Sequence, residues 1–172
     1  MEAIKDIEAI KDMDLSEKHV LDVCCGGKMF WFDKNNKDTL YCDIREVEKG
    51  YIEWCPNWEC KPNVIADYRD LPFPDKSFKL IVWDIPHIIK GSSGIITKKY
   101  GSLGENWKED TTKAFKSIWS KLDTHGTLCF KYSDLDIKVS EMLKLFPVRP
   151  LFGTMTKKAV NNTYWFCFFK SE

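Results

Sequence analysis

Residues 19–27 read HVLDVCCGG, an apolar run that ends in two glycines. A short apolar run with valines is typical of a buried strand, which we expect over residues 19–25. Gly26 and Gly27 follow at once, and a helix is expected from Lys28. Such a turn lets the backbone come close to a ligand, and the start of the helix offers unpaired N–H groups. The stretch therefore predicts the first strand, turn and helix of an α/β fold.

The alternation of strands and helices continues along the chain. Further strands are expected over residues 39–42, 64–66, 78–83, 127–131 and 163–169, with helices over 107–122 and 135–146. Three of these strands end at an aspartate, namely Asp43, Asp67 and Asp84. Ligands of open α/β sheets bind beyond the carboxyl ends of the strands. The sequence predicts a Rossmann-like α/β sandwich, with a mostly parallel sheet, an antiparallel terminal strand and a binding site at one edge.

The length fits a single domain over residues 1–172. An apolar residue at every third position predicts an N-terminal packing helix over residues 1–16. Two segments interrupt the alternation: an insert over residues 44–62 and a loop rich in glycine and serine over residues 86–106. Loops of that length in compact domains are usually functional, so we interpret the second as a lid on the substrate side.

Composition argues against a strongly basic nucleic-acid binder, a membrane-spanning protein and a secreted protein. Lys plus Arg equals Asp plus Glu at 26 each, so any contact with nucleic acid has to come from a local patch. No stretch approaches the roughly 18 apolar residues of a membrane span. The seven cysteines are scattered and no signal peptide precedes them, which favours reduced thiols and a cytoplasmic location.

The series of acidic strand ends has a chemical interpretation. Asp43 follows the glycine turn by about twenty residues, where a carboxylate suits the paired hydroxyls of a ribose. Asp67 ends the next strand, where it could accept a hydrogen bond from an adenine amine. Each carboxylate alone could be a solvated strand end, but the ordered series favours a nucleoside-containing ligand.

Together, DVCCGG at residues 22–27, Asp43 and Asp67 resemble the cofactor motifs of class I S-adenosylmethionine-dependent methyltransferases. The resemblance spans about residues 18–170, although Cys24 stands where a glycine is commoner. The runs VLDVCCGGKMFWFD and ADYRDLPFPDKSFKLIVWDIPH also resemble short methyltransferases of bacteria and their phages. The resemblance implies S-adenosylmethionine as the cofactor, with Asp22 bracing the turn or holding the methionine ammonium group. The cofactor-binding residues that it implies are Asp22, Cys24, Gly26, Gly27, Asp43, Ile44, Asp67, Tyr68 and Asp84.

Residues 84–87 read DIPH, which resembles the [DN]-P-P-[YFWH] motif of amino methyltransferases, with Ile85 in place of the first proline. The lone pair of an aromatic amine is delocalised into its ring, so the nitrogen is a poor nucleophile. A carboxylate and a backbone carbonyl that accept both N–H groups draw the nitrogen towards a tetrahedral state and stabilise the positive charge that develops. The expected catalytic residues are Asp84, Pro86, which fixes the carbonyl, and His87, which can stack on the target ring.

If the target is an amine, we expect an exocyclic amine of a nucleic-acid base, and adenine N6 is the favoured position. The partner is then DNA or RNA, with the base flipped out or supplied in a single strand. Lys99 and Tyr100 of the lid and Lys131 at a strand end are the expected substrate contacts. The chain has no room for a target-recognition domain, so reading a long site needs a partner or a homodimer. Carbon or oxygen targets, a small-molecule or protein substrate, and a non-catalytic cofactor-binding subunit stay open.

The cysteines also raise the question of a metal site. Cys42, Cys55 and Cys60 have the spacing C-x12-C-x4-C, which is not a tight paired pattern of structural zinc sites. Buried thiols are the favoured interpretation, and no metal is expected. Cys24 and Cys25 end a core strand and are interpreted as packing residues.

Overall fold

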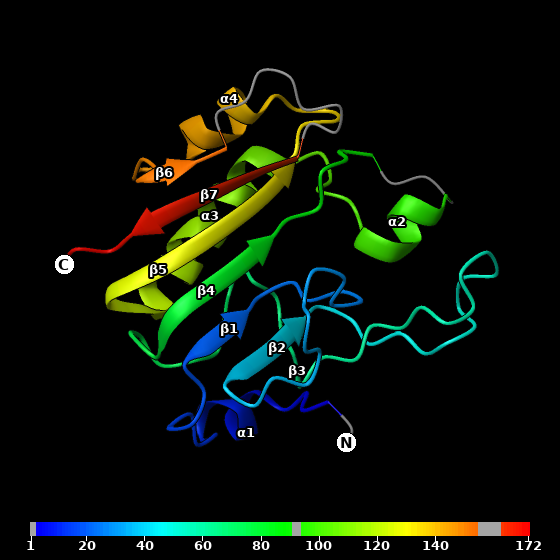
Figure 1. Ribbon diagram of the computed structural model, residues 1–172, viewed down its shortest axis with the longest axis horizontal. Helices are drawn as coiled ribbons and strands as arrows, with labels where there is room; N and C mark the ends of the chain where they lie inside the picture. The colour runs from blue at the N-terminus through cyan, green and yellow to red at the C-terminus, as the bar shows by residue number, and fades with distance from the viewer. Residues whose placement is uncertain (1–2, 91–93, 155–162) are drawn as a thin grey trace.

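The computed structural model describes residues 3–90, 94–154 and 163–172. In this part of the chain seven strands form one sheet, in the order β3-β2-β1-β4-β5-β7-β6 (Figure 1). The strands are β1 (Val20–Asp22), β2 (Thr39–Asp43), β3 (Val64–Ile65), β4 (Phe78–Asp84), β5 (Leu122–Ser133), β6 (Phe152–Gly153) and β7 (Thr163–Phe169). The pairs among β1 to β5 are parallel, whereas β7 is antiparallel to both β5 and β6. The predicted fold class is confirmed, and the short strand β6 is an addition to it.

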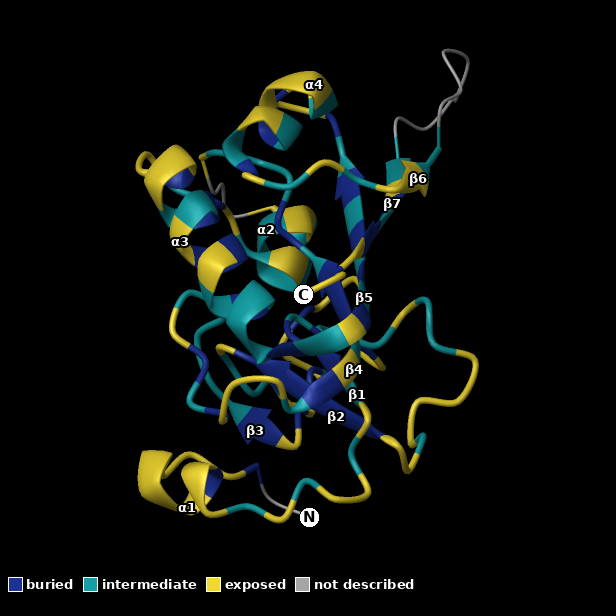
Figure 2. Ribbon diagram, turned by 90° about the vertical axis from the view of Figure 1, so that its left-hand side faces the viewer, coloured by how far each residue is buried: buried dark blue, intermediate teal, exposed yellow. Residues whose placement is uncertain are grey.

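The core lies between the sheet and the helix α3 (Trp107–Lys121), which runs along one face of the sheet in Figure 2. Along β5, Leu128, Phe130 and Tyr132 are buried, while the residues between them are only half-buried. Phe115 of α3 stacks on Phe146 at a centroid distance of 4.6 Å. Alternate burial of this kind is expected of a strand with one face on the core. Large aromatic side chains therefore hold β4 and β5 in place beneath the predicted site.

The helix expected from Lys28 is wrong, because residues 23–38 form turns and bends. The carboxylate of Asp33 accepts the backbone N–H of Asn35 at 2.9 Å, and the amide oxygen of Asn36 accepts that of Asp38 at 3.1 Å. Asp and Asn side chains that bond nearby backbone in this way compete with a helix. The glycine turn consequently leads into a turn-rich loop, without a helix N-terminus.

Two other expected helices are shorter than predicted. At the N-terminus only α1 (Ile7–Lys11) is helical, and Asp14 turns the chain beyond it by accepting the N–H of Ser16. Among the apolar residues that recur at every third position, Ile10 is buried, whereas Ile7 is exposed.

The helix expected over residues 135–146 is reduced to α4 (Val139–Met142) and a 3-10 turn, η1 (Leu143–Leu145). The hydroxyl of Tyr132 donates to the carbonyl of Ile137 at 2.9 Å, which occupies a group that a longer helix would use.

Both of the segments that interrupt the alternation contain local structure. The insert over residues 44–62 consists of turns around a bridge between Val47 and Cys60. The lid over residues 86–106, of which 91–93 lie outside the described residues, contains the helix α2 (Ile95–Tyr100). Its base is closed by backbone hydrogen bonds from Leu103 to Ile88 and from Gly104 to Ile89. None of the helices in the described ranges combines the length and apolar character of a membrane span.

Candidate functional site

A cavity of about 500 Å³ opens at the carboxyl ends of β1, β2, β4 and β5. It collects almost all residues that the sequence singled out. The predicted residues in its lining are Cys24, Gly26, Gly27, Asp43, Ile44, Asp67, Tyr68, Asp84, Pro86, His87, Lys99, Tyr100 and Lys131. Asp22 is the exception, because its buried side chain lies behind the residues that line the cavity. The structure thus brings the expected cofactor residues and the expected catalytic residues to one cavity.

Asp22 braces the glycine turn from within. Its side chain is fully buried, accepts the indole N–H of Trp31 at 2.7 Å and accepts the backbone N–H of Cys24 at 3.2 Å. Burial raises the pKa of this carboxyl to about 7, against the lowering effect of these two hydrogen bonds. The hydrogen bond to Cys24 lies within the turn, as the bracing role of Asp22 requires.

The two glycines of the turn are needed for different reasons. Gly26 has a φ of +47°, a region that side chains disfavour, and its N–H donates to Asp43 Oδ2 at 2.9 Å. A Cβ on Gly27 would lie 2.5 Å from the indole nitrogen of Trp58, a buried residue of the insert. The insert therefore packs directly against the turn.

We expect Gly27→Ala to lower the free energy of unfolding by about 1–3 kcal/mol, the usual cost of overpacking. The physical reason is the contact with Trp58, so the loss should shrink when Gly27→Ala is made in a Trp58→Ala background. Gly26→Ala is the matched control, because nothing lies within 4 Å of its added Cβ and its cost comes from backbone strain alone. Urea denaturation of the four variants measures this, and equal losses at Gly27 in both backgrounds would contradict the contact.

Asp43 links the turn to the lid through Arg45. Its buried carboxylate accepts the backbone N–H of Arg45 at 3.2 Å, and burial raises its pKa. The Arg45 guanidinium donates to the carbonyl of Lys98 at 2.8 Å and also to that of Lys99, at the end of α2. Sequence reasoning missed Arg45, since no local pattern indicates a contact across more than fifty residues.

At the expected adenine end, the Asp67 carboxylate is paired with an arginine. Arg69 Nε donates to both oxygens of Asp67, at 3.0 and 2.9 Å, and another Arg69 nitrogen donates to Asp110 at 2.9 Å. Burial would raise the pKa of Asp67, but these hydrogen bonds outweigh it and the pKa is lowered. The Thr111 hydroxyl is buried in the cavity wall and has no hydrogen-bond partner among the described residues.

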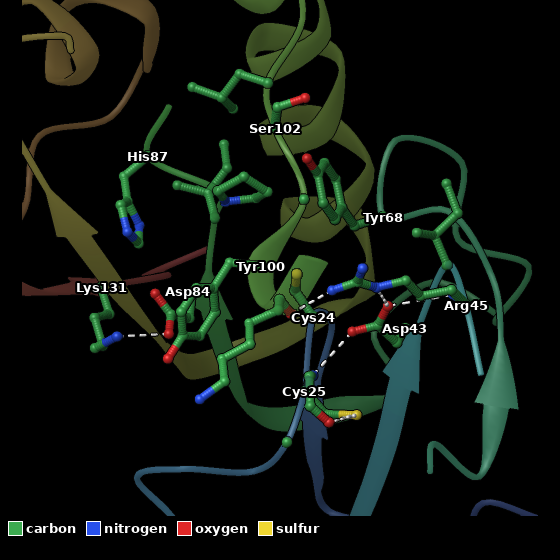
Figure 3. Close-up of a pocket in the computed structure, with 18 of the residues that line it drawn as sticks. Cys24, Cys25, Asp43, Arg45, Tyr68, Asp84, His87, Tyr100, Ser102 and Lys131 are labelled. Carbon is green, nitrogen blue, oxygen red and sulfur yellow. Dashed lines mark hydrogen bonds and ion pairs between the residues drawn. The ribbon is translucent and has the colours of Figure 1, made fainter. Parts of the chain in front are cut away.

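The catalytic end of the cavity is built around an ion pair. Lys131 Nζ lies 2.5 Å from Asp84 Oδ2, and Figure 3 shows this pair on the side of the cavity away from Asp43 and Arg45. Burial raises the pKa of Asp84, although Lys131 opposes the shift. The His87 ring lies 5.9 Å from that of Tyr100, and its Nδ1 is buried without a partner in the described part of the chain. Burial lowers the pKa of His87, which favours the neutral ring.

Comparison with known proteins shows the fold. No protein-family model and no curated protein matches the sequence. Among solved structures, the chain is similar to a Pyrococcus horikoshii protein, with a TM-score of 0.59, 15% identity and coverage of 88% of this chain and 81% of that one. It is similar to an rRNA methylase from Streptococcus thermophilus, with a TM-score of 0.55, 11% identity and coverage of 96% and 92%. A TehB-like S-adenosylmethionine-dependent methyltransferase from Corynebacterium glutamicum has a TM-score of 0.54, 13% identity and coverage of 100% and 82%.

Proposed function

We propose that the chain is an S-adenosylmethionine-dependent N-methyltransferase that acts on an exocyclic amine of a nucleic-acid base, with adenine N6 favoured. One observation carries the proposal. A single cavity is bounded by the glycine turn and Asp43 at one end and by residues 84–87 at the other. Methyl transfer requires a donor and an amine in adjacent subsites, and this cavity offers two chemically different ends.

The residues at the first end fit the proposed cofactor. The open backbone of Gly26 and Gly27 would face its methionine portion, and Asp43 has acceptor capacity left for ribose hydroxyls. Since Arg69 engages Asp67, we assign the polar contact to the adenine to the Thr111 hydroxyl, which has no partner among the described residues and lines the same cavity as Tyr68. Asp67 then acts by holding Arg69. When bound, the cofactor would supply an electrophilic methyl group on a sulfonium.

The other end fits a flat aromatic amine. The Asp84 carboxylate would accept N–H groups from the amine and stabilise its developing positive charge. Pro86 is buried beside it and fixes the turn, and the neutral His87 ring and Tyr100 offer faces for a base. Lys131 would keep Asp84 ionised, and Lys99 would add a positive charge to the entrance.

Nucleic acid is the substrate class that we favour for this end. An extruded or single-stranded base presents the amine and the ring face that Asp84, His87 and Tyr100 suit. One solved structure with a similar fold is named an rRNA methylase, which supports this choice by analogy only. A homodimer would extend the contact surface, and seven free thiols support a cytoplasmic location.

The proposal is tested by incubating the protein with S-adenosylmethionine labelled in the methyl group and with single-stranded DNA, duplex DNA and RNA in separate pools. Label should enter a nucleic-acid pool, and digestion to nucleosides should identify N6-methyladenine. Label at another base amine would correct the target. If the cofactor binds but no pool takes up label, a small-molecule or protein substrate or a non-catalytic subunit is favoured. If the cofactor does not bind, the proposal is refuted.

The ion pair gives the reaction a specific pH dependence. Asp84 must be ionised to accept N–H groups, so kcat/KM should fall as the pH drops through its raised pKa. Lys131→Met removes the charge that opposes this rise, and the acid limb should move to higher pH by about 1–3 units. Lys131→Arg keeps the charge and is the control. Profiles of kcat/KM against pH measure the shift, and an unmoved limb in Lys131→Met would argue against the assignment.

A further inference from the structure

Three potential metal ligands meet at the glycine turn, and one of them, Asp43, also accepts the N–H of Gly26 and is assigned above to the cofactor ribose. The Sγ atoms of Cys25 and Cys60 and a carboxylate oxygen of Asp43 all lie within 4.8 Å of one another, and all three side chains are buried. They come from the turn after β1, from the end of β2 and from the insert. This set is not the one considered from the sequence, which was Cys42, Cys55 and Cys60. The folded chain brings Cys60 close to Cys25 instead.

The insert that supplies Cys60 has very little core of its own. The buried residues of its small core cluster are Ile52, Trp58 and Cys60, and its only regular pairing in the described chain is the bridge between Val47 and Cys60. Tyr51 and Trp54 are exposed. Small independent folds with so little buried apolar surface usually need a disulfide or a metal, and a metal would restrain this insert in the same way. The three clustered ligands lie where the insert joins the sheet.

We propose that Cys25, Asp43 and Cys60 bind a thiophilic divalent cation, with Zn²⁺ as the preferred ion, which fastens the insert to the glycine turn. Bonds of about 2.3 Å to sulfur and about 2.0–2.2 Å to oxygen place tetrahedral ligand atoms roughly 3.5–3.8 Å apart. A closing movement of about 1 Å at the side chains is therefore enough to reach this geometry. Water takes the fourth position.

The charges at the site suit such an ion. Binding releases the two thiol protons to solvent, and the resulting two thiolates and one carboxylate carry three negative charges. A divalent ion together with the guanidinium of Arg45, whose Nε lies 3.9 Å from Asp43 Oδ1, balances them. Two thiolate ligands select soft or borderline ions such as Zn²⁺ over Mg²⁺ and Ca²⁺. A carboxylate oxygen has two lone pairs, so Asp43 can keep its hydrogen bonds to the backbone while it binds the ion.

The test uses the full chain, freed of metal by a chelator and kept under a phosphine reductant without oxygen. Co²⁺ is added first, because thiolate ligands give it a charge-transfer absorption band, and Zn²⁺ is then titrated to displace it. We expect about one equivalent of each ion, and no uptake of Mg²⁺. Cys60→Ser should weaken Zn²⁺ binding by at least about 100-fold, the upper end of the cost of losing a supporting partner of a ligand. Cys55→Ser is the matched control, since Cys55 packs in the same insert but outside the cluster.

The metal titrations separate a bound ion from a set of ordinary buried thiols. Uptake of Zn²⁺ with the thiolate band, retained in Cys55→Ser and lost in Cys60→Ser and Cys25→Ser, would support it. Absence of the band, equal binding by Cys60→Ser and Cys55→Ser, or a Cys25–Cys60 disulfide in the purified protein in place of bound metal would overturn it. Metal uptake is measured without cofactor or substrate, so the result is independent of the proposed methyltransferase activity.

Discussion

Replacing Asp84 by alanine is expected to lower kcat for methyl transfer by about 10²–10³-fold, which corresponds to roughly 2.7–4 kcal/mol of transition-state stabilisation. The carboxylate is the only acidic group at the catalytic end among the described cavity residues, and Lys131 pairs with it at 2.5 Å. Without it, no carboxylate among the described residues at this end accepts the N–H groups of the amine or offsets the charge that develops on nitrogen. Affinity for the cofactor should change far less, because Asp43 and the glycine turn lie at the other end. Steady-state kinetics and equilibrium cofactor binding separate the two effects.

A graded set of variants tests whether Asp84 acts as a hydrogen-bond acceptor. Asp84→Asn keeps one carbonyl oxygen in place, so its rate should lie between those of the alanine variant and the native protein. Asp123→Ala is the matched control. Asp123 also pairs with a lysine, Lys79, at 2.5 Å, but this pair is exposed and lies outside the cavity. Full activity in Asp84→Ala, or a loss of similar size in Asp123→Ala, would refute the catalytic role.

The features that were predictable from the sequence are those that local chemistry determines. The apolar run at residues 78–83 has to be a buried strand, and Asp84 then lies at its carboxyl end whatever the rest of the chain does. The same reasoning placed Asp43 and Asp67 at one edge of a parallel sheet, and the cavity contains all three. Order along the chain is enough for such inferences, because parallel strands align their ends.

The features that were missed depend on contacts between distant segments or on competition between side chain and backbone. Arg45 bonds carbonyls of the lid more than fifty residues away, and Cys25 meets Cys60 only after the insert folds back. No local pattern indicates either contact. The helix expected from Lys28 failed for the second reason, since the Asp33 and Asn36 side chains bond the backbone nearby. Loops and inserts are therefore where sequence reasoning about this fold loses detail.

Trp83→Ala is expected to lower the free energy of unfolding by about 3–5 kcal/mol. The indole is fully buried on β4, and its ring centroid lies 5.0 Å from that of Phe130, 5.7 Å from that of Phe146 and 5.9 Å from that of Tyr68. Truncation leaves a cavity among rings that cannot collapse into it, directly before Asp84. Urea denaturation measures the loss as a lower midpoint with an unchanged m-value.

Trp83→Phe separates the contribution of the ring from that of its polar group. The indole N–H is buried without a hydrogen-bond partner among the described residues, so replacing it by an apolar edge removes an unsatisfied donor. Phenylalanine also leaves a smaller cavity than alanine does, so its cost should lie well below the roughly 3–5 kcal/mol expected for Trp83→Ala. A loss in Trp83→Phe as large as that in Trp83→Ala would mean that the N–H has a partner in solution. It would also mean that this end of the core is held by a polar contact as well as by packing.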